Sequence, residues 1–151
     1  MRIAICDDQK EIRELFQERV RRLYPKAELS LFCSGEALLT SDKQSDILLL
    51  DIQMPGKNGM DTARELRRKN KDTIIIFVTA LEDFVFQAFD VGAFHYLVKP
   101  FQEKKFVEVL MKAAAQSEEN KKRETAKIKK EKPGLVITTK GRHITVDFAD
   151  I

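Results

Sequence analysis

The feature of this sequence that most constrains its fold is a regular alternation of short apolar runs with longer amphipathic stretches. Three runs are continuously apolar, as in strands buried on both faces: residues 3–6, 47–50 and 74–78. A run at 27–33 alternates apolar and polar residues, which is typical of a strand nearer a sheet edge, and a fifth short run covers 94–98.

The stretches that follow these runs carry apolar residues at helical spacing. Helices are predicted at residues 9–24, 34–39, 59–70, 82–91 and 102–117. Asp8 is expected to cap the first helix and Gly92 to end the fourth. Strand followed by helix, repeated five times, predicts an α/β fold of the flavodoxin-like kind, a doubly wound five-stranded parallel sheet with helices on both faces.

Polar side chains directly follow four of the predicted strands. They are Asp7 and Asp8 after the first strand, Asp51 after the third, Thr79 after the fourth, and Lys99 with Pro100 after the fifth. In open α/β sheets the binding crevice lies beyond the carboxyl ends of the strands, so these groups are expected to meet there. Carboxylates pressed together repel, and they take up either a proton or a cation; oxygen ligands with room for water suit Mg²⁺.

The same set of groups suits phosphoryl transfer. A lysine ammonium and a threonine hydroxyl can each pair with a phosphoryl oxygen held beside one carboxylate, and a carboxylate can itself become an acyl phosphate. Together these residues resemble the receiver domain of two-component response regulators. The resemblance covers residues 1 to about 118 and rests on Asp7-Asp8, Asp51 with Met54-Pro55-Gly56-Lys57-Asn58-Gly59, Thr79-Ala80 and Lys99-Pro100-Phe101.

The resemblance implies a role for each position. Asp51 would accept a phosphoryl group from a sensor histidine kinase, and the chain would act as a switch rather than as an enzyme that turns over a substrate. Asp8 and Asp51 would bind Mg²⁺ through their side chains, Asp7 through water, and Gln53 through its backbone carbonyl.

The other implied roles concern the switch. Thr79 and Tyr96 would form the switch pair, with Tyr96 turning inward behind Thr79, while the small Ala80 leaves room beside the phosphoryl group. Lys99 would pair with the phosphoryl group, and Pro100 is a candidate for a cis peptide bond. Since Leu81 is apolar and cannot orient a water molecule, we expect slow self-dephosphorylation.

Other interpretations compete with these. A haloacid-dehalogenase-type phosphatase also uses a nucleophilic aspartate, but it needs a second aspartate two residues later, where this chain has Gln53. A nucleotide-binding flavodoxin-like module would need a glycine-rich loop after the first strand, where this chain has acidic residues. Asp8 as a helix cap only and Tyr96 as core packing only are the blander alternatives. His95 is expected to be a surface residue on an outer strand rather than a ligand.

The last part of the chain has a different character. Residues 1–118 would form the receiver domain, 119–132 a charged linker or helix extension, and 133–151 the truncated start of an all-β domain. Seven lysines and arginines between 121 and 132 suit either a solvated linker or an arm for DNA phosphates. Runs at 135–139 and 142–148 around Lys140-Gly141 predict a hairpin. This segment is similar to the opening strands of LytTR-type DNA-binding domains, which implies DNA as a partner of the whole protein.

Three further expectations concern the environment and the surface. Cys6 and Cys33 are predicted to be buried thiols, and without a signal peptide or an apolar membrane span the chain is expected in the cytoplasm. The fourth helix carries Phe84, Val85, Phe86 and Phe89, more large apolar groups than one inward stripe needs. Some should be exposed, so we expect a phosphorylation-promoted homodimer through the fourth helix, fifth strand and fifth helix.

Overall fold

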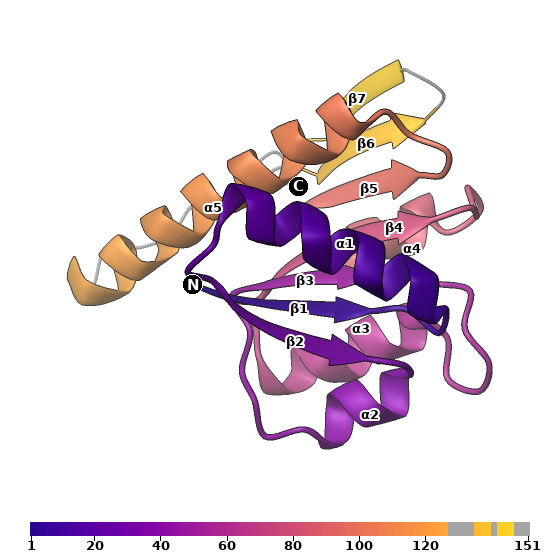
Figure 1. Ribbon diagram of the computed structural model, residues 1–151, viewed down its shortest axis with the longest axis horizontal. Coiled ribbons are helices and arrows are strands. Elements are labelled where there is room, and N and C mark those ends of the chain that lie inside the picture. The colour runs from indigo at the N-terminus through magenta and orange to yellow at the C-terminus, as the bar shows by residue number, and fades with distance from the viewer. Residues whose placement is uncertain (127–134, 140–141, 147–151) are drawn as a thin grey trace.

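The computed structural model describes residues 1–126, 135–139 and 142–146, and the elements within them alternate as predicted (Figure 1). In chain order they are β1 (Arg2–Cys6), α1 (Lys10–Leu23), β2 (Glu28–Phe32), α2 (Gly35–Thr40), β3 (Ile47–Leu50), α3 (Gly59–Lys69), β4 (Ile74–Thr79), α4 (Val85–Asp90), β5 (His95–Val98), α5 (Glu103–Ala126), β6 (Leu135–Thr139) and β7 (Arg142–Val146).

The first five strands form the predicted parallel sheet, in the order β2-β1-β3-β4-β5. The chain first builds outward from β1 to β2 and then crosses to β3, so the sheet is doubly wound. Cys6 lies opposite Leu50, and Leu50 lies opposite Phe77. The residues that follow β1 and β3 therefore leave neighbouring strands at the same edge of the sheet, which is where the predicted crevice lies.

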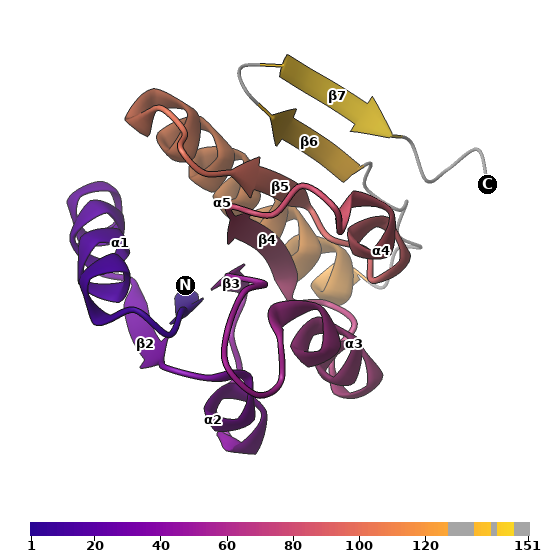
Figure 2. The ribbon, with the colours of Figure 1, turned by 90° about the vertical axis from the view of Figure 1, so that its right-hand side faces the viewer.

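Helices cover both faces of this sheet, with α1 and α5 on one side and α2, α3 and α4 on the other (Figure 2). Each face has its own hydrophobic core. Along β1, for example, Ala4 and Cys6 pack on the α2–α4 side, whereas Ile3 and Ile5 pack on the α1–α5 side. Because both faces are buried, β1, β3 and β4 need apolar residues at successive positions, which explains their continuous apolar runs.

The sheet continues beyond β5. β6 pairs in parallel with β5, and β7 pairs antiparallel with β6. The two strands of the predicted hairpin are thus confirmed, while its turn at residues 140–141 lies outside the described residues.

Several predictions about single residues were wrong. His95 is buried, because β5 is flanked by β4 and β6 rather than lying at an open edge. Cys33 is exposed, because β2 ends one residue earlier at Phe32; Cys6 is buried as predicted. Asp8 does not cap α1: the N-cap residue is Gln9, and no side chain caps that helix end.

Two helices differ from their predicted bounds by more than two residues at one end. α4 begins at Val85 rather than at residue 82, because the preceding loop is held by the side chains of Thr79 and Tyr96. α5 runs to Ala126, so the charged segment after residue 118 begins as a helix extension. None of the helices in the described part of the chain has both the length and the apolar composition needed to cross a membrane.

Candidate functional site

Three carboxylates gather at the carboxyl edge of the sheet, as the sequence predicts. Asp7 directly follows β1, Asp51 directly follows β3, and Asp8 lies at the start of the loop to α1. One carboxylate oxygen from each of the three lies within 4.8 Å of the others. Asp7 and Asp51 are only 2% and 8% exposed, and Asp8 is the most open of the three.

Lys99 supplies the opposite charge from the end of β5. Its Nζ lies 3.3 Å from Asp7 Oδ2 and 3.4 Å from Asp51 Oδ2. Its backbone N–H donates to the carbonyl of Thr79 at 2.8 Å, which continues the pairing of β4 with β5 up to the site. The Lys99–Pro100 peptide bond is cis, as predicted.

The site holds more negative than positive charge in a poorly solvated place. Burial raises the pKa of Asp7, while a hydrogen bond from the backbone N–H of Gln9 and the charge of Lys99 oppose that rise. Three carboxylates facing one ammonium, with oxygen ligands within reach of one another, are a donor set that fits a hard divalent cation such as Mg²⁺. The residues present therefore fit the predicted metal.

The main chain around Asp51 fixes the direction of its side chain. Asp51 Oδ1 accepts from the backbone N–H of Gln53 at 3.2 Å, and the N–H of Gly59 donates to the carbonyl of Ile52 at 2.9 Å. A Cβ on Gly59 would lie 2.0 Å from the Asp51 carbonyl oxygen, so only glycine lets α3 begin this close to the site. Metal binding by the Gln53 carbonyl stays a prediction; the structure shows only its N–H engaged.

Asp8 is free for the cluster because other groups organise the start of α1. The Gln9 N–H donates to Asp7 Oδ1 at 2.9 Å, and Arg13 from α1 donates to the Asp7 carbonyl at 2.8 Å. Arg13 was not found from the sequence. One arginine among several on an amphipathic helix carries no signal of its own, and only the fold brings it to the carbonyl.

Thr79 and Tyr96 are linked through one loop residue rather than directly. Thr79 is fully buried, and its Oγ1 accepts from the backbone N–H of Leu81 at 3.3 Å. The Tyr96 hydroxyl donates to the carbonyl of the same Leu81, and its ring packs against Phe77 at 5.9 Å between centroids. Burial raises the pKa of Tyr96, so the hydroxyl stays a donor at physiological pH. Ala80 is exposed beside Thr79.

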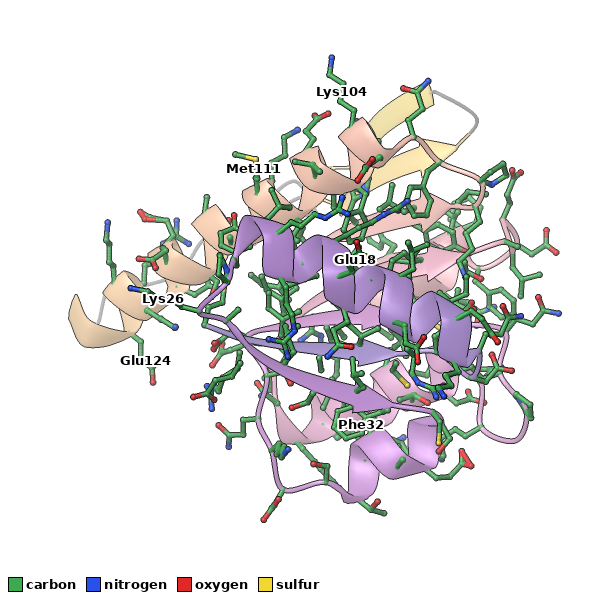
Figure 3. All side chains as sticks on the ribbon, in the orientation of Figure 1. Glu18, Lys26, Phe32, Lys104, Met111 and Glu124 are labelled. Atoms are coloured by element: carbon green, nitrogen blue, oxygen red, sulfur yellow. The ribbon has the colours of Figure 1, made fainter. Side chains whose placement is uncertain are left out.

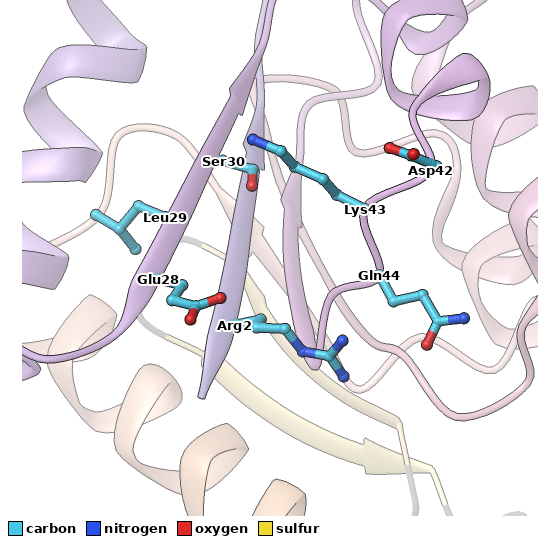
Figure 4. A pocket seen from close by; sticks show the side chains of 7 residues that line it. All are labelled: Arg2, Glu28, Leu29, Ser30, Asp42, Lys43 and Gln44. Carbon is cyan, nitrogen blue, oxygen red and sulfur yellow. The ribbon is translucent and has the colours of Figure 1, made fainter.

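A cavity of about 450 Å³ lies at the opposite end of the sheet, where β1 and β2 begin (Figure 4). Arg2 and Lys43 are its cationic lining residues, and Glu28 and Asp42 its anionic ones. The charges of this lining balance, whereas the carboxylate site holds three carboxylates against one ammonium and so suits a divalent cation.

Comparisons with known proteins agree with the geometry of the carboxylate site. The family model of the response regulator receiver domain matches residues 3–111. The chain is 40% identical over 113 residues to the sensory transduction protein LytT of Oceanobacillus iheyensis, covering 69% of this chain and 44% of LytT. It is 38% identical over 117 residues to the positive alginate biosynthesis regulatory protein of Pseudomonas aeruginosa, covering 76% and 47%. The chain thus spans about half the length of these curated relatives.

A solved structure shows the same fold. The response regulator protein TrrA of Thermotoga maritima, in complex with Mg²⁺ and beryllium fluoride, superposes with a TM-score of 0.66 at 33% identity. The match covers 74% of this chain and 97% of TrrA.

Proposed function

Since this chain belongs to the response regulator receiver domain family, we propose that it is a phosphorylation-dependent switch whose phosphoacceptor is Asp51. The observation that carries this proposal is the buried carboxylate of Asp51, held within 3.4 Å of the Lys99 ammonium and close to two further carboxylates. The donor would be a phosphohistidine of a sensor kinase. A carboxylate oxygen of Asp51 forms a bond to phosphorus as the bond between phosphorus and the histidine nitrogen breaks, and the histidine keeps that electron pair.

The residues around Asp51 would bind and orient the phosphoryl group, while Asp51 alone takes part in the covalent step. Lys99, now shared between Asp7 and Asp51, would pair with a phosphoryl oxygen. Asp8, Asp51 and the Gln53 carbonyl would hold Mg²⁺, with Asp7 acting through water. When bound, Mg²⁺ would neutralise the carboxylates and gather phosphoryl oxygens beside Asp51.

The loop after β4 would carry the signal away from the site. Thr79 Oγ1 now accepts from the Leu81 N–H. A phosphoryl oxygen is a strong acceptor, so it would draw the Thr79 hydroxyl toward itself and weaken that contact. Since Leu81 also binds the Tyr96 hydroxyl, the change at Thr79 would reach β5 through one residue.

In the whole protein we propose that this switch controls a DNA-binding output domain in the cytoplasm. The similarity of residues 133–151 to the start of LytTR-type domains supports this proposal. The relatives, of which this chain covers somewhat less than half, include a protein named as a regulator of alginate biosynthesis.

The test is intact mass after incubation with acetyl phosphate and Mg²⁺. We expect wild type to gain one phosphoryl group and Asp51→Asn to gain none. Asp42→Asn is the matched control, because Asp42 is an exposed aspartate at the opposite end of the sheet. Equal labelling of wild type and Asp51→Asn would refute the assignment of Asp51 as the phosphoacceptor. Continued release of inorganic phosphate without a stable adduct would indicate a phosphatase instead.

A further inference from the structure

The carboxyl end of α4 is held in place by several contacts. The N–H groups of Gly92 and Ala93 turn back to the carbonyls of Phe89 and Ala88 at 3.0 and 3.1 Å, and Gly92 has a positive φ of 67°. This is a Schellman ending. The next residue, Phe94, donates from its N–H to the carbonyl of Ile75 at 2.7 Å, which joins the turn to β4.

Arg67 from α3 secures the same turn. Its guanidinium donates to the carbonyls of Val91 at 2.7 Å and Gly92 at 3.1 Å, which end α4. It also donates to the carbonyls of Thr73 at 2.6 Å and Asn70 at 3.5 Å, on the connection from α3 to β4. Burial lowers the pKa of Arg67 to about 10, so the group remains charged at physiological pH and its hydrogen bonds are charge-assisted.

The amino end of α4 is held differently. The N-cap residue Phe84 provides no side-chain cap. In the loop before it, Leu81 is held by Thr79 and Tyr96, the two residues of the proposed switch. One end of α4 therefore depends on groups that respond to the phosphoryl site, and the other end on groups from α3 and β4.

From this asymmetry we propose that Arg67 is a positioning residue that fixes the carboxyl end of α4, so that activation swings α4 about that end. The proposal rests on the proposed function of the site. When Thr79 turns toward the phosphoryl group, the loop at residues 81–84 is released and the amino end of α4 moves. Phe86, which is 87% exposed and lies near that end, moves with it, while Val91 and Gly92 stay in place.

Hydrogen exchange of the full chain with and without beryllium fluoride and Mg²⁺ tests the pivot. In wild type, activation should change exchange over residues 81–87 and leave that over 91–94 unaltered. In Arg67→Gln, exchange over 91–94 should rise about tenfold even without activation, as expected for the loss of a charge-assisted hydrogen bond. Activation of this variant should then alter the whole span from 81 to 94.

Two further variants sharpen the result. Arg64→Gln is the matched control: Arg64 lies three residues earlier on α3, is exposed, and reaches α4 only through the Gln87 side chain at 2.6 Å, so wild-type behaviour is expected. Arg67→Lys keeps the charge but not the planar fork, and should loosen 91–94 less than Arg67→Gln. If Arg67→Gln does not fold, the proposal is tested by comparing hydrogen exchange over residues 91–94 in Arg67→Lys with that in Arg64→Gln.

The outcomes separate the pivot from the function it rests on. Three outcomes would overturn the proposed pivot of α4. The first is a change in exchange over residues 91–94 when wild type is activated, and the second is no change over residues 81–87 in a protein that takes up the phosphoryl group. The third is a wild-type exchange pattern in both Arg67 variants. Failure of wild type to gain mass from acetyl phosphate would instead refute the proposed function. Exchange of the unactivated variants would still report whether Arg67 anchors the turn.

Discussion

At the scale of single residues, Leu81 lies where it would take part both in the proposed switch and in the access of water to the site. Its backbone joins Thr79 to Tyr96, and its side chain packs partly against the core beside α4. An apolar side chain here cannot align a water molecule with the phosphorus, so we expect a phosphoryl half-life well beyond seconds at room temperature. Leu81→Asn should shorten it on the order of tenfold, because a polar group can orient the attacking water. Decay of the phosphorylated mass measures this, with Glu82→Gln as control; a half-life of seconds in wild type would contradict it.

Asp7 carries a cost in the metal-free protein. Because burial raises its pKa, ionising Asp7 is less favourable in the folded than in the unfolded state, and this cost is present above the folded-state pKa. Asp7→Asn should therefore raise the free energy of unfolding at pH 7 without Mg²⁺, by roughly 1 kcal/mol. The advantage should shrink as the pH falls through the raised pKa of folded Asp7 toward the usual range of aspartate, because wild-type Asp7 then becomes protonated.

Urea denaturation of wild type and Asp7→Asn between pH 5 and pH 8, with and without Mg²⁺, is the measurement. Mg²⁺ should stabilise wild type more than the variant, because it relieves the repulsion that the substitution has removed. A variant that is less stable than wild type without metal would show that the Asp7 contacts with Gln9 and Lys99 outweigh the repulsion.

The site residues could be predicted because their position depends on strand ends alone. Asp7, Asp51 and Lys99 follow apolar strands, and parallel strands end at one edge of the sheet, so no knowledge of packing was needed. Residues whose surroundings depend on neighbouring elements could not be placed in this way. The exposure of His95 depends on whether another strand pairs with β5, and that of Cys33 on the last residue of β2.

At the scale of elements, the start of α3 depends on a close backbone approach. Gly59→Ala would place a methyl group 2.0 Å from the Asp51 carbonyl oxygen and 2.7 Å from Ile52 Cα. Neither backbone atom can yield cheaply, so we expect a loss of about 3 kcal/mol in unfolding free energy and weaker phosphorylation of Asp51. Gly92→Ala is the matched comparison, because a Cβ there meets only Arg67 Nε, at 3.9 Å. The expected loss in unfolding free energy is then that of a positive φ alone, about 1 kcal/mol. Similar losses in both variants, measured by urea denaturation, would contradict this account.

Helix ends were harder to predict than helices because tertiary contacts set them. The apolar spacing of α5 stops near Ser117, yet the helix continues to Ala126. Gln116 bonds to Asn120 at 2.9 Å within this extension, and Lys121 reaches Asp46 at the base of β3 at 3.6 Å. Arg67 was missed for the same reason, since its sequence position on an exposed-looking stretch of α3 gives no sign of the carbonyls it meets.

At the scale of the whole molecule, the position of the last two strands bears on how two copies could meet. The strands of the predicted hairpin are present, but β6 adds to the receiver sheet beside β5. That residues 133–151 begin a separate output domain stays a prediction. With β6 in this place, the edge of β5 is covered. A second copy that binds on this side of the molecule would contact α4 and α5. It would also have to cover or displace β6 and β7.

The exposed apolar residues favour a phosphorylation-promoted dimer on this side. Of the four large apolar residues around α4, Phe84, Val85 and Phe89 pack partly against the core, whereas Phe86 is 87% exposed. On α5, Met111 is 54% exposed and points to solvent (Figure 3). A pivot of α4 about its carboxyl end would move the exposed Phe86 more than Phe89, which gives the active state a different apolar surface from the inactive one.

We therefore expect sedimentation to show a shift toward dimer on addition of beryllium fluoride and Mg²⁺, and Phe86→Glu to weaken the activated dimer at least about tenfold, as for an anchoring aromatic residue. Phe86 is the better substitution than Phe84, because a glutamate at the half-buried Phe84 would disturb the core as well. Leu15→Glu, at a 39% exposed leucine on α1, is the control for adding a charge to an apolar surface position and should leave the dimer intact. Since the exposed Phe86 side chain makes little contribution to the core, both variants should fold and take up the phosphoryl group like wild type. A monomer at high concentration in both states, or an activated dimer that Phe86→Glu leaves unchanged, would rule out this face.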